Sequence, residues 1–225
     1  MSFFKLKLKK KEIKYEDVAI LDFSIVGKNK LKFTPGQYMN LSSPKNNLGR
    51  AYTIISQPND NLIRFAVRKK GEFSTLLSNL KINEIINADG PYGNFCPDNT
   101  DKKIICIAGG IGITPFISWI NKDDFKNTEV TFLFSNGSID RSPFLEDIVN
   151  NKRIKNTLFI TKEKGIKDRK IVRHRIEKED IKKVIINKKE TVIAICGSIG
   201  FTRDIWKMVK SLGIPEDQII TESFF

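Results

Sequence analysis

The sequence predicts two structural parts, a six-stranded antiparallel β-barrel followed by an α/β unit with a parallel sheet. The first hundred of the 225 residues contain short alternating or β-branched segments between turn residues, which is typical of a small antiparallel barrel. After residue 100, continuous apolar runs alternate with helical segments, which is typical of a parallel sheet covered on both faces. We therefore expect one domain over residues 1–99 and another over residues 100–225.

Six segments of the first part have the strand pattern, and one helix interrupts them. The helix is expected over residues 74–80, because Leu76, Leu77 and Leu80 recur at helical spacing behind Ser74, a capping residue. The turns are expected at Pro35-Gly36, Asn59-Asp60-Asn61 and Gly90-Pro91-Tyr92-Gly93. The strands are expected over residues 6–13, 18–26, 37–41, 52–56, 62–67 and 84–88.

The second part opens on a buried strand, residues 103–108, which is followed by a glycine turn and a helix over residues 114–120. Residues 201–212 have a helical pattern that Gly213 closes and Pro215 stops. The remaining expected elements are strands over 130–134, 157–161, 192–196 and 219–223, a helix over 143–149, and a charged loop and helix region over 163–189.

The composition argues against several kinds of site. Cys96, Cys106 and Cys196 are too few and too widely spaced for a disulfide framework, a structural zinc site or an iron–sulfur cluster. His174, the only histidine, lies between two arginines and is expected on the surface, which disfavours zinc chemistry and a Ser-His-Asp triad. No segment has the apolar stretch of a signal peptide or the roughly 20 apolar residues of a membrane span. We therefore expect a soluble, cytoplasmic protein without a metal site and with reduced thiols.

The chain is strongly basic, with 39 Lys and Arg residues against 26 acidic residues and a formal net charge of +13. Such a charge favours acidic partners, namely nucleic acid, anionic lipid, a phosphate-bearing ligand or an acidic protein. A lysine-rich solvated surface explains the same charge without any partner. The sequence contains no recognisable nucleic-acid-binding motif, so nucleic acid is the weaker alternative.

Two glycine-containing motifs follow buried strands of the second part. Gly109-Gly110-Ile111-Gly112-Ile113-Thr114-Pro115-Phe116 opens a helix, where glycines let the backbone approach a pyrophosphate and helix amides supply positive charge. No Gly-Lys-Ser/Thr follows, which disfavours ATP hydrolysis. Cys196-Gly197-Ser198 also follows a strand, at the sheet edge where α/β proteins bind ligands. Taken alone, Cys196 is typical of a small buried core residue.

Three further motifs lie in the first part: Arg50-Ala51-Tyr52-Thr53, residues 68–75, and Gly90-Pro91-Tyr92-Gly93. Arginine pairs well with phosphate, a tyrosine ring can lie against a planar heterocycle, and the amides of residues 71–74 can face a pyrophosphate. Together with residues 109–115, residues 196–198 and the terminal Glu222-Ser223-Phe224-Phe225, their order and spacing resemble the ferredoxin–NADP reductase superfamily of flavoenzymes over nearly the whole chain.

This resemblance implies an FAD-binding barrel and an NAD(P)-binding α/β domain. Tyr52 would stack on the isoalloxazine and Arg50 would contact the FAD phosphates. The candidate catalytic residues are Thr53, whose hydroxyl would approach flavin N5, Cys196, beside nicotinamide C4, and Glu222, near the hydride path. The candidate binding residues are Arg50, Ala51, Tyr52, Thr53, Arg68, Gly71, Phe73, Ser74, Thr75 and Phe225 for FAD, and Gly110, Ile111, Thr114, Ser135, Cys196, Gly197 and Ser198 for NAD(P).

The choice between NADH and NADPH stays open at this point. A pocket for the adenosine 2′-phosphate would be lined by serine, arginine or lysine after the middle strands, and Ser135, Arg141, Thr161 and Lys162 are the candidates. The segment Asn136-Gly137-Ser138 with Asp140 also resembles NAD-using relatives.

The function implied by the resemblance is an FAD-dependent NAD(P)H oxidoreductase that passes electrons to a separate acceptor. That acceptor would be a small acidic redox protein, ferredoxin or flavodoxin, or a small molecule, and the chain would act as a monomer or weak dimer without binding membrane or nucleic acid. The alternatives are a flavin reductase or diaphorase, the reductase component of an oxygenase, and a non-catalytic flavin-binding electron-transfer or regulatory subunit.

Overall fold

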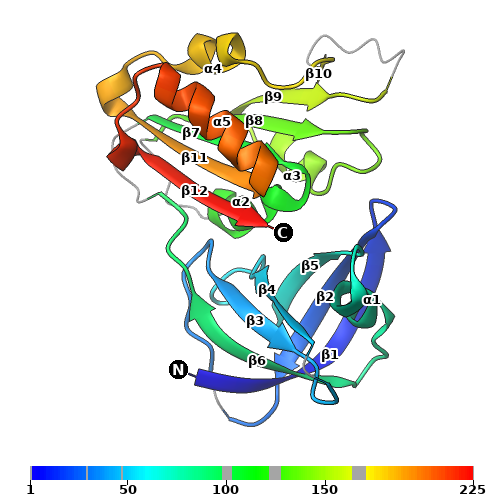
Figure 1. Cartoon of the computed structure of the whole chain (residues 1–225). Coiled ribbons are helices and arrows are strands. Elements are labelled where there is room, and N and C mark those ends of the chain that lie inside the picture. Colours follow the sequence, from blue (N-terminus) through cyan, green and yellow to red (C-terminus); the bar gives the residue numbers. More distant parts are fainter. Residues whose placement is uncertain are drawn as a thin grey trace. The chain divides into compact units, whose positions relative to one another are not determined.

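The structure is a computed structural model that describes residues 2–28, 30–46, 48–97, 103–121, 128–163 and 171–224. The chain divides into two compact units, each with one sheet (Figure 1). Unit 1 consists of Met1–Asn94 and Thr114–Asn121, and unit 2 of Phe95–Ile113 and Lys122–Phe225. The antiparallel sheet of one and the parallel sheet of the other confirm the predicted fold class. The expected domain boundary at residues 99 and 100 lies outside the described residues.

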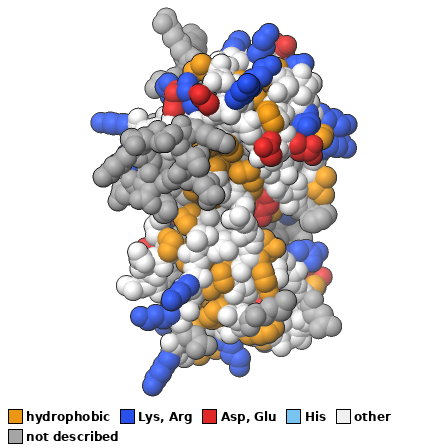
Figure 2. Space-filling view, turned by 90° about the vertical axis from the view of Figure 1, so that its left-hand side faces the viewer, with side chains coloured by type: hydrophobic (Ala, Val, Ile, Leu, Met, Phe, Trp, Pro, Cys, Tyr) orange, Lys and Arg blue, Asp and Glu red, His pale blue; other side chains and the backbone are white. Residues whose placement is uncertain are grey.

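The surface is basic without one dominant patch in view. Lys and Arg side chains occupy several separate places on the face shown in Figure 2. The imidazole of His174 is 47% exposed, as expected for a surface histidine, and it lies 3.7 Å from the Asp180 carboxylate. In the part of the chain that the structure describes, no helix is both long and apolar enough to cross a bilayer.

The described residues of unit 1 form six antiparallel strands in the order β4-β3-β6-β1-β2-β5. They are β1 (Ser2–Lys14), β2 (Val18–Ile25), β3 (Tyr38–Ser42), β4 (Gly49–Thr53), β5 (Ile63–Arg68) and β6 (Ile85–Tyr92). The sheet curls until its two edge strands approach each other, and a bridge between Ile54 and Phe65 joins the chain after β4 to β5. A hydrogen bond from the Ile55 N–H to the Arg64 carbonyl, 2.9 Å long, continues this closure.

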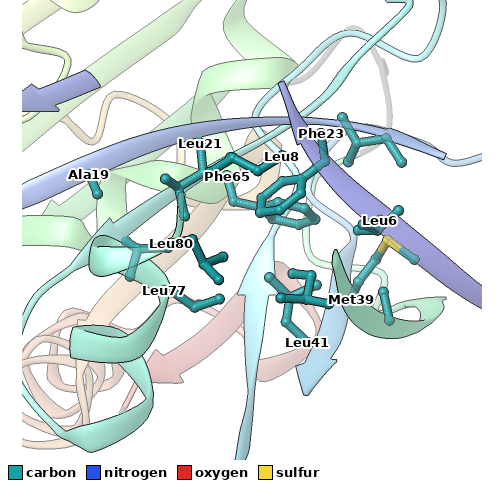
Figure 3. Close-up of a cluster of buried hydrophobic side chains, with 14 of the residues drawn as sticks. Leu6, Leu8, Ala19, Leu21, Phe23, Met39, Leu41, Phe65, Leu77 and Leu80 are labelled. Carbon is teal, nitrogen blue, oxygen red and sulfur yellow. The ribbon is translucent and has the colours of Figure 1, made fainter. Parts of the chain in front are cut away.

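The core of unit 1 follows from the strand alternation. Phe4, Leu6 and Leu8 of β1 point inward, because successive side chains of a strand face opposite sides of the sheet. They meet the inward side chains of the other strands, and helix α1 (Glu72–Asn79) adds its apolar face to the same cluster (Figure 3). The Lys11 ammonium donates hydrogen bonds to the Ser78 and Leu80 carbonyls at 3.1 and 2.8 Å, which satisfies the exposed carbonyls at the helix end.

In unit 2, the residues that the structure describes form six parallel strands in the order β10-β9-β8-β7-β11-β12. They are β7 (Lys103–Gly109), β8 (Val130–Asn136), β9 (Ile154–Ile160), β10 (Ile171–Val172), β11 (Thr191–Ser198) and β12 (Ile219–Phe224). The main helices are α3 (Leu145–Val149), α4 (Lys178–Val184) and α5 (Ile199–Ser211), and short 3-10 helices are η1 (Gly110–Ile113), η2 (Lys188–Glu190) and η3 (Glu216–Gln218). Ile205 and Val209 of α5 pack on one face of the central strands, and the continuous apolar runs of β7 and β11 match strands buried on both sides.

The prediction that Gly90-Pro91-Tyr92-Gly93 forms a tight turn is wrong for its first three residues. Gly90, Pro91 and Tyr92 belong to β6, opposite an irregularity in the pairing with β3 between Tyr38 and Asn40. Gly90 has a φ of +137°, and a Cβ there would lie 3.2 Å from the Tyr38 carbonyl oxygen. A glycine fits this strand because it tolerates the positive φ of the distorted pairing.

Two other expected elements are displaced. The strand expected over residues 52–56 is β4, Gly49–Thr53, because the chain leaves β3 just after it: the Ile54 N–H still bonds to the Gln37 carbonyl, whereas the Ile55 N–H bonds to the Arg64 carbonyl, each at 2.9 Å. The helix expected to follow Ser74 begins at Glu72 with Gly71 as its N-cap. Ser74 lies inside the first turn, and its hydroxyl accepts the Gly71 N–H at 2.9 Å.

Candidate functional site

The Arg50-Ala51-Tyr52-Thr53 motif lies along β4, an edge strand of unit 1 that pairs with β3 on one side only. The Arg50 side chain is exposed and donates to the Gly49 carbonyl at 2.8 Å. The Tyr52 ring lies 6.2 Å from the Phe73 ring and is partly buried against the core. Burial raises the pKa of Tyr52 to about 12, against a smaller lowering by Arg50, so the phenol stays neutral at physiological pH.

Thr53 ends β4, and its side chain is buried. The residue is 4% exposed, and its Oγ1 has no hydrogen-bond partner among the residues that the structure describes. Within the described residues, the only other buried side-chain polar atom in this condition is Oε2 of Glu222. A buried hydroxyl without a partner is unusual in a folded protein, since leaving it unpaired costs about 1–3 kcal/mol. Both atoms belong to candidate catalytic residues.

The Ser74 side chain forms hydrogen bonds within the turn before α1. The Ser74 hydroxyl accepts the N–H groups of Lys70 and Gly71 and donates to the Gly71 carbonyl, each at 2.9 Å. Ser74 therefore shapes the turn, and a phosphate would meet the amides of the first helical turn, which have no acceptor within the helix. Arg68 is paired with Asp17 at 3.1 Å, and Thr75 stands half-buried in α1.

The candidate nucleotide residues of unit 2 gather at the carboxyl ends of three neighbouring strands. Gly109 at the end of β7 is in register with Ser135 of β8, and Cys196 of β11 is in register with Ala108. Gly110 and Ile111 continue from β7 into η1; Thr114, which follows η1 in the chain and begins helix α2 (Thr114–Ile120), is grouped with unit 1. Ligands of open α/β sheets bind at this edge.

Close packing explains why glycines occur here. A Cβ added at Gly112 would lie 2.5 Å from the Cys196 carbonyl oxygen, so only glycine lets η1 approach β11. Cβ atoms at Gly109 and Gly197 would lie 2.9 and 2.5 Å from the Phe201 ring. Sequence reasoning missed Phe201, whose ring packs against Gly109 and Gly197. The only signal in the sequence was the aromatic residue four positions after Gly197.

Ser198 ends β11 and caps α5. Its hydroxyl accepts the Phe201 N–H at 3.4 Å, so the side chain belongs to the helix start, while its exposed position leaves it reachable. Phe224 of β12 is in register with Ser198 and half-buried. Phe225, the candidate for covering the flavin, lies outside the described residues.

Glu222 lies on β12 in register with Cys196, and both side chains therefore face the same side of the sheet. Burial raises the pKa of Glu222 to about 7, which places its proton exchange at physiological pH. Burial, reinforced by the Glu222 carboxylate and by Cys96, raises the pKa of the Cys196 thiol well above its usual range. Cys196 is therefore a neutral thiol, which suits packing beside a ring better than nucleophilic attack.

The four candidates for 2′-phosphate recognition follow the ends of β8 and β9. The Thr161 N–H donates to the Asn136 carbonyl at 3.1 Å, and the Lys162 N–H donates to the Gly137 carbonyl at 2.9 Å. Ser135 and Lys162 thus belong to adjacent strand ends. Arg141 lies beside the end of β8, because its carbonyl accepts a hydrogen bond from the Asn136 side-chain amide at 2.7 Å.

The residues of unit 1 fit a flavin dinucleotide. Thr53 offers a buried hydroxyl without a partner in the described ranges, Tyr52 offers a neutral aromatic ring, and Arg50 offers an exposed guanidinium on the same strand. These are a hydrogen-bonding group, a stacking surface and a phosphate-pairing group, in that order along one edge. In the described ranges, no three His, Cys, Asp or Glu side chains are placed to hold a metal ion.

Comparison with known proteins agrees with this reading of the two units. Residues 5–96 match the family "Oxidoreductase FAD-binding domain". Flavohemoprotein A of Dictyostelium discoideum is 25% identical over 88% of this chain and 54% of its own length. The reductase component of propane 2-monooxygenase from Mycolicibacterium smegmatis is 26% identical over 95% of this chain and 65% of its own length. The chain thus spans between half and two thirds of these two relatives.

The same fold occurs in solved structures. A ferredoxin NADP+ reductase from Neisseria gonorrhoeae, determined with bound FAD and NADP, superposes with a TM-score of 0.84 at 17% identity and covers 100% of both chains. The family match confirms the expected FAD-binding domain, and the solved structures confirm the expected two-part fold. Residues 5–96 thus match an FAD-binding oxidoreductase domain, and the whole chain shares its fold with this ferredoxin NADP+ reductase.

Proposed function

We propose that this chain is an FAD-dependent NAD(P)H reductase that delivers electrons to a separate acceptor. FAD, when bound, accepts a hydride from a nicotinamide and releases its electrons one at a time. The family match over residues 5–96 supports the flavin half, and the glycine-rich carboxyl edge of unit 2 supports the nucleotide half. Relatives named as reductase or electron-transfer components of oxygenases support an oxygenase component or a small redox protein as the acceptor.

The proposal is carried by two buried atoms, Thr53 Oγ1 and Glu222 Oε2, for which the described part of the chain supplies no hydrogen-bond partner. Each unit contains one of them, and each belongs to a residue that the motif order places at the reacting centre. A protein that needed these residues only for folding would pair or expose such groups. We infer that Thr53 donates a hydrogen bond to the flavin ring and that Glu222 holds a proton near the nicotinamide path.

The other candidate residues have binding roles in this proposal. Arg50 and the first-turn amides of α1 pair with the FAD phosphates, and Tyr52 supplies the ring surface. Gly110, Ile111 and Thr114 line the dinucleotide turn, and the Ser135 and Lys162 corner decides between NADH and NADPH. Cys196 excludes water beside the ring as a neutral thiol, and positioning of the two rings supplies most of the acceleration.

The test is an anaerobic titration of the FAD-loaded chain with NADH and, separately, with NADPH. We expect the flavin absorbance to bleach with one nucleotide at a lower concentration than with the other. Thr53→Val should retain FAD but slow the bleaching about 10- to 1,000-fold, as expected when a hydrogen bond to the reacting group is lost. Thr53→Ser, which keeps a hydroxyl, is the matched control and should bleach much faster than Thr53→Val.

Two outcomes would contradict the proposal. A chain that does not retain FAD has no reductase function of this kind. A chain that retains FAD but bleaches with neither nucleotide is a flavin-binding subunit without its own turnover. Steady oxidation of NAD(P)H with ferricyanide by the isolated chain would exclude that second class.

A further inference from the structure

A carboxylate is held in place at the corner of unit 2 where β8 and β9 end. Oε1 of Glu163 accepts the Ile139 N–H at 2.7 Å. Glu163 is half-buried and follows the end of β9, and Ile139 follows the end of β8. One hydrogen bond thus fixes a carboxylate beside the candidate residues for 2′-phosphate recognition.

Two backbone amides of this corner have acceptors within the chain. The Gly137 N–H donates to the Asn136 side-chain oxygen at 2.8 Å, and the Ile139 N–H donates to Glu163. Loops that bind phosphate present such amides to the anion. A phosphate that approached the Ile139 amide would have to displace a negatively charged side chain, so this part of the loop disfavours an anion.

The corner lies within reach of a dinucleotide bound at the glycine turn of the same unit. Gly109 at the end of β7 is in register with Ser135 of β8, and Ser135 is in register with Phe159 of β9. Neighbouring strands lie about 4.8 Å apart, so the ends of β7 and β9 are separated by about 10 Å. A pyrophosphate on the turn after β7 can therefore place its adenosine ribose near the ends of β8 and β9. In dinucleotide-binding sheets, a carboxylate near this ribose accepts a hydrogen bond from the 2′-hydroxyl of NAD, and an arginine accommodates the 2′-phosphate of NADP.

Two cationic residues at the same corner act in the opposite direction. Lys162 and Arg141 are both exposed, and an exposed long side chain loses conformational entropy when it pairs with an anion. Glu163 is half-buried and already bonded to the backbone, so its charge acts on a ligand without that ordering cost. We therefore expect the fixed negative charge to dominate at this corner.

We propose that Glu163 makes this chain specific for NADH, an inference that rests on the proposed reductase function. A carboxylate has about four acceptor positions, so Glu163 can hold the Ile139 N–H and accept a hydrogen bond from the adenosine 2′-hydroxyl together. A 2′-phosphate at the same place lacks that hydroxyl and brings negative charge against the carboxylate. The same residue thus favours NADH and disfavours NADPH.

The test compares two probes that differ only in the 2′-phosphate. ADP-ribose and its 2′-phosphate contain no nicotinamide ring, so they report binding without hydride transfer. Their dissociation constants for the FAD-loaded full chain are measured by isothermal titration calorimetry. We expect ADP-ribose to bind about tenfold more tightly or better, which corresponds to one charge pair in a partly solvated site. NADH should likewise bleach the flavin at a lower concentration than NADPH, and this second measurement decides the preference if the probes bind weakly.

Glu163→Gln removes the charge but keeps an oxygen that can accept the Ile139 N–H, and the preference for ADP-ribose should fall to about twofold or less. Glu163→Ala removes the charge and the acceptor together and should lose the preference as well. The matched control is Glu190→Gln, which removes an exposed carboxylate of unit 2 directly before the amino end of β11, at the opposite edge of the sheet. This control should keep the natural ratio.

Two results would overturn the inference while leaving the proposed function intact. One is a natural chain that binds the two probes equally or prefers the 2′-phosphate. The other is a Glu163→Gln chain that keeps the full preference for ADP-ribose while Glu163→Ala loses it, since Glu163 would then only shape the loop. A chain that binds neither probe and whose flavin is bleached by neither nucleotide would contradict the proposed function as well, so the two failures are distinguishable.

Discussion

Thr53 is buried in a way that folding alone does not favour. Its hydroxyl is shielded from water and has no partner among the described residues, so the folded chain loses the hydrogen bonds that water supplies to the unfolded chain. We therefore expect Thr53→Val to stabilise the FAD-free chain by about 1 kcal/mol, measured by urea denaturation. The same change is expected to slow the reduction of bound FAD by NAD(P)H.

Thr53→Ser is the control for this stability change, because it keeps the hydroxyl and deletes a buried methyl group instead. It should not be more stable than the natural chain. If Thr53→Val is instead the less stable protein, the hydroxyl has a structural partner and the functional reading of this atom is wrong.

Glu222 gives the folded chain a predictable pH dependence. Burial raises the pKa of its carboxyl from 4.5 to about 7, so between these values the folded state keeps a proton that the unfolded state has lost. The stability contributed by this proton is present below about pH 4.5 and is lost as the pH rises through about 7. Glu222→Gln stays neutral and escapes this loss.

We expect Glu222→Gln and the natural chain to unfold at similar temperatures near pH 5, and the variant to unfold at the higher temperature near pH 8. Calorimetry or circular dichroism at the two pH values measures the difference. Glu190→Gln changes an exposed carboxylate of the same unit and serves as the control. A Glu222→Gln chain with the same advantage at both pH values would mean that Glu222 is ionised throughout.

Sequence motifs could identify Thr53 and Glu222 but not the roles of Ser74 and Phe201. A motif records which residue types recur in order, whereas a hydrogen bond back to Gly71 or a ring packed on two glycines depends on how the chain folds. The Glu163 contact was invisible for the same reason, since its partner Ile139 lies 24 positions away along the chain.

At the scale of the element, the contact between η1 and β11 makes Gly112 intolerant of a side chain. Gly112→Ala would push a methyl group against backbone atoms at 2.5 Å, so the turn must open. We expect about 2–4 kcal/mol of lost stability and a weaker affinity for NAD(P)H, measured by denaturation and by titration.

Gly200 in α5 is the matched control, because a Cβ there would meet nothing within 4 Å. Gly200→Ala should leave stability unchanged or raise it by up to about 1 kcal/mol, since alanine restricts the unfolded chain. Equal losses of stability in Gly112→Ala and Gly200→Ala would show that the close contact between η1 and β11 does not determine the effect.

Most elements could be predicted because their patterns are local. The buried runs of β7 and β11 and the helix closed by Gly213 are examples. The end of β4 could not be predicted, because Ile54 and Ile55 have strand composition, yet the chain leaves β3 there and the Ile55 N–H bonds to Arg64 of β5. Within the charged region 163–189, the short strand β10 and the exact extent of α4 depend on pairing and packing with β9 and α5.

For the whole molecule, the net charge of +13 predicts that the rate of association with an acidic electron acceptor depends on salt. The second-order rate of electron transfer to an acidic redox protein should fall about tenfold or more between about 20 and 200 mM salt, because screening removes electrostatic steering. A neutral quinone is the control and should show little change. Stopped-flow measurements with both acceptors decide the point, and equal salt dependence would mean that the charge is only a solvated surface.

The assignment of α2 to the barrel unit also has a consequence for exchanging parts between reductases. A chimera joined near residue 99 takes the barrel from one parent and residues 114–121 from the other, so Ser118, the buried hydrogen-bond partner of Gly36, Ile54 and Gln57, comes from a foreign sequence. Successful exchange of the flavin-binding half therefore requires transplanting a non-contiguous piece. A chimera built by one exchange at a single chain position would place residues 114–121 of one parent against the barrel core of the other.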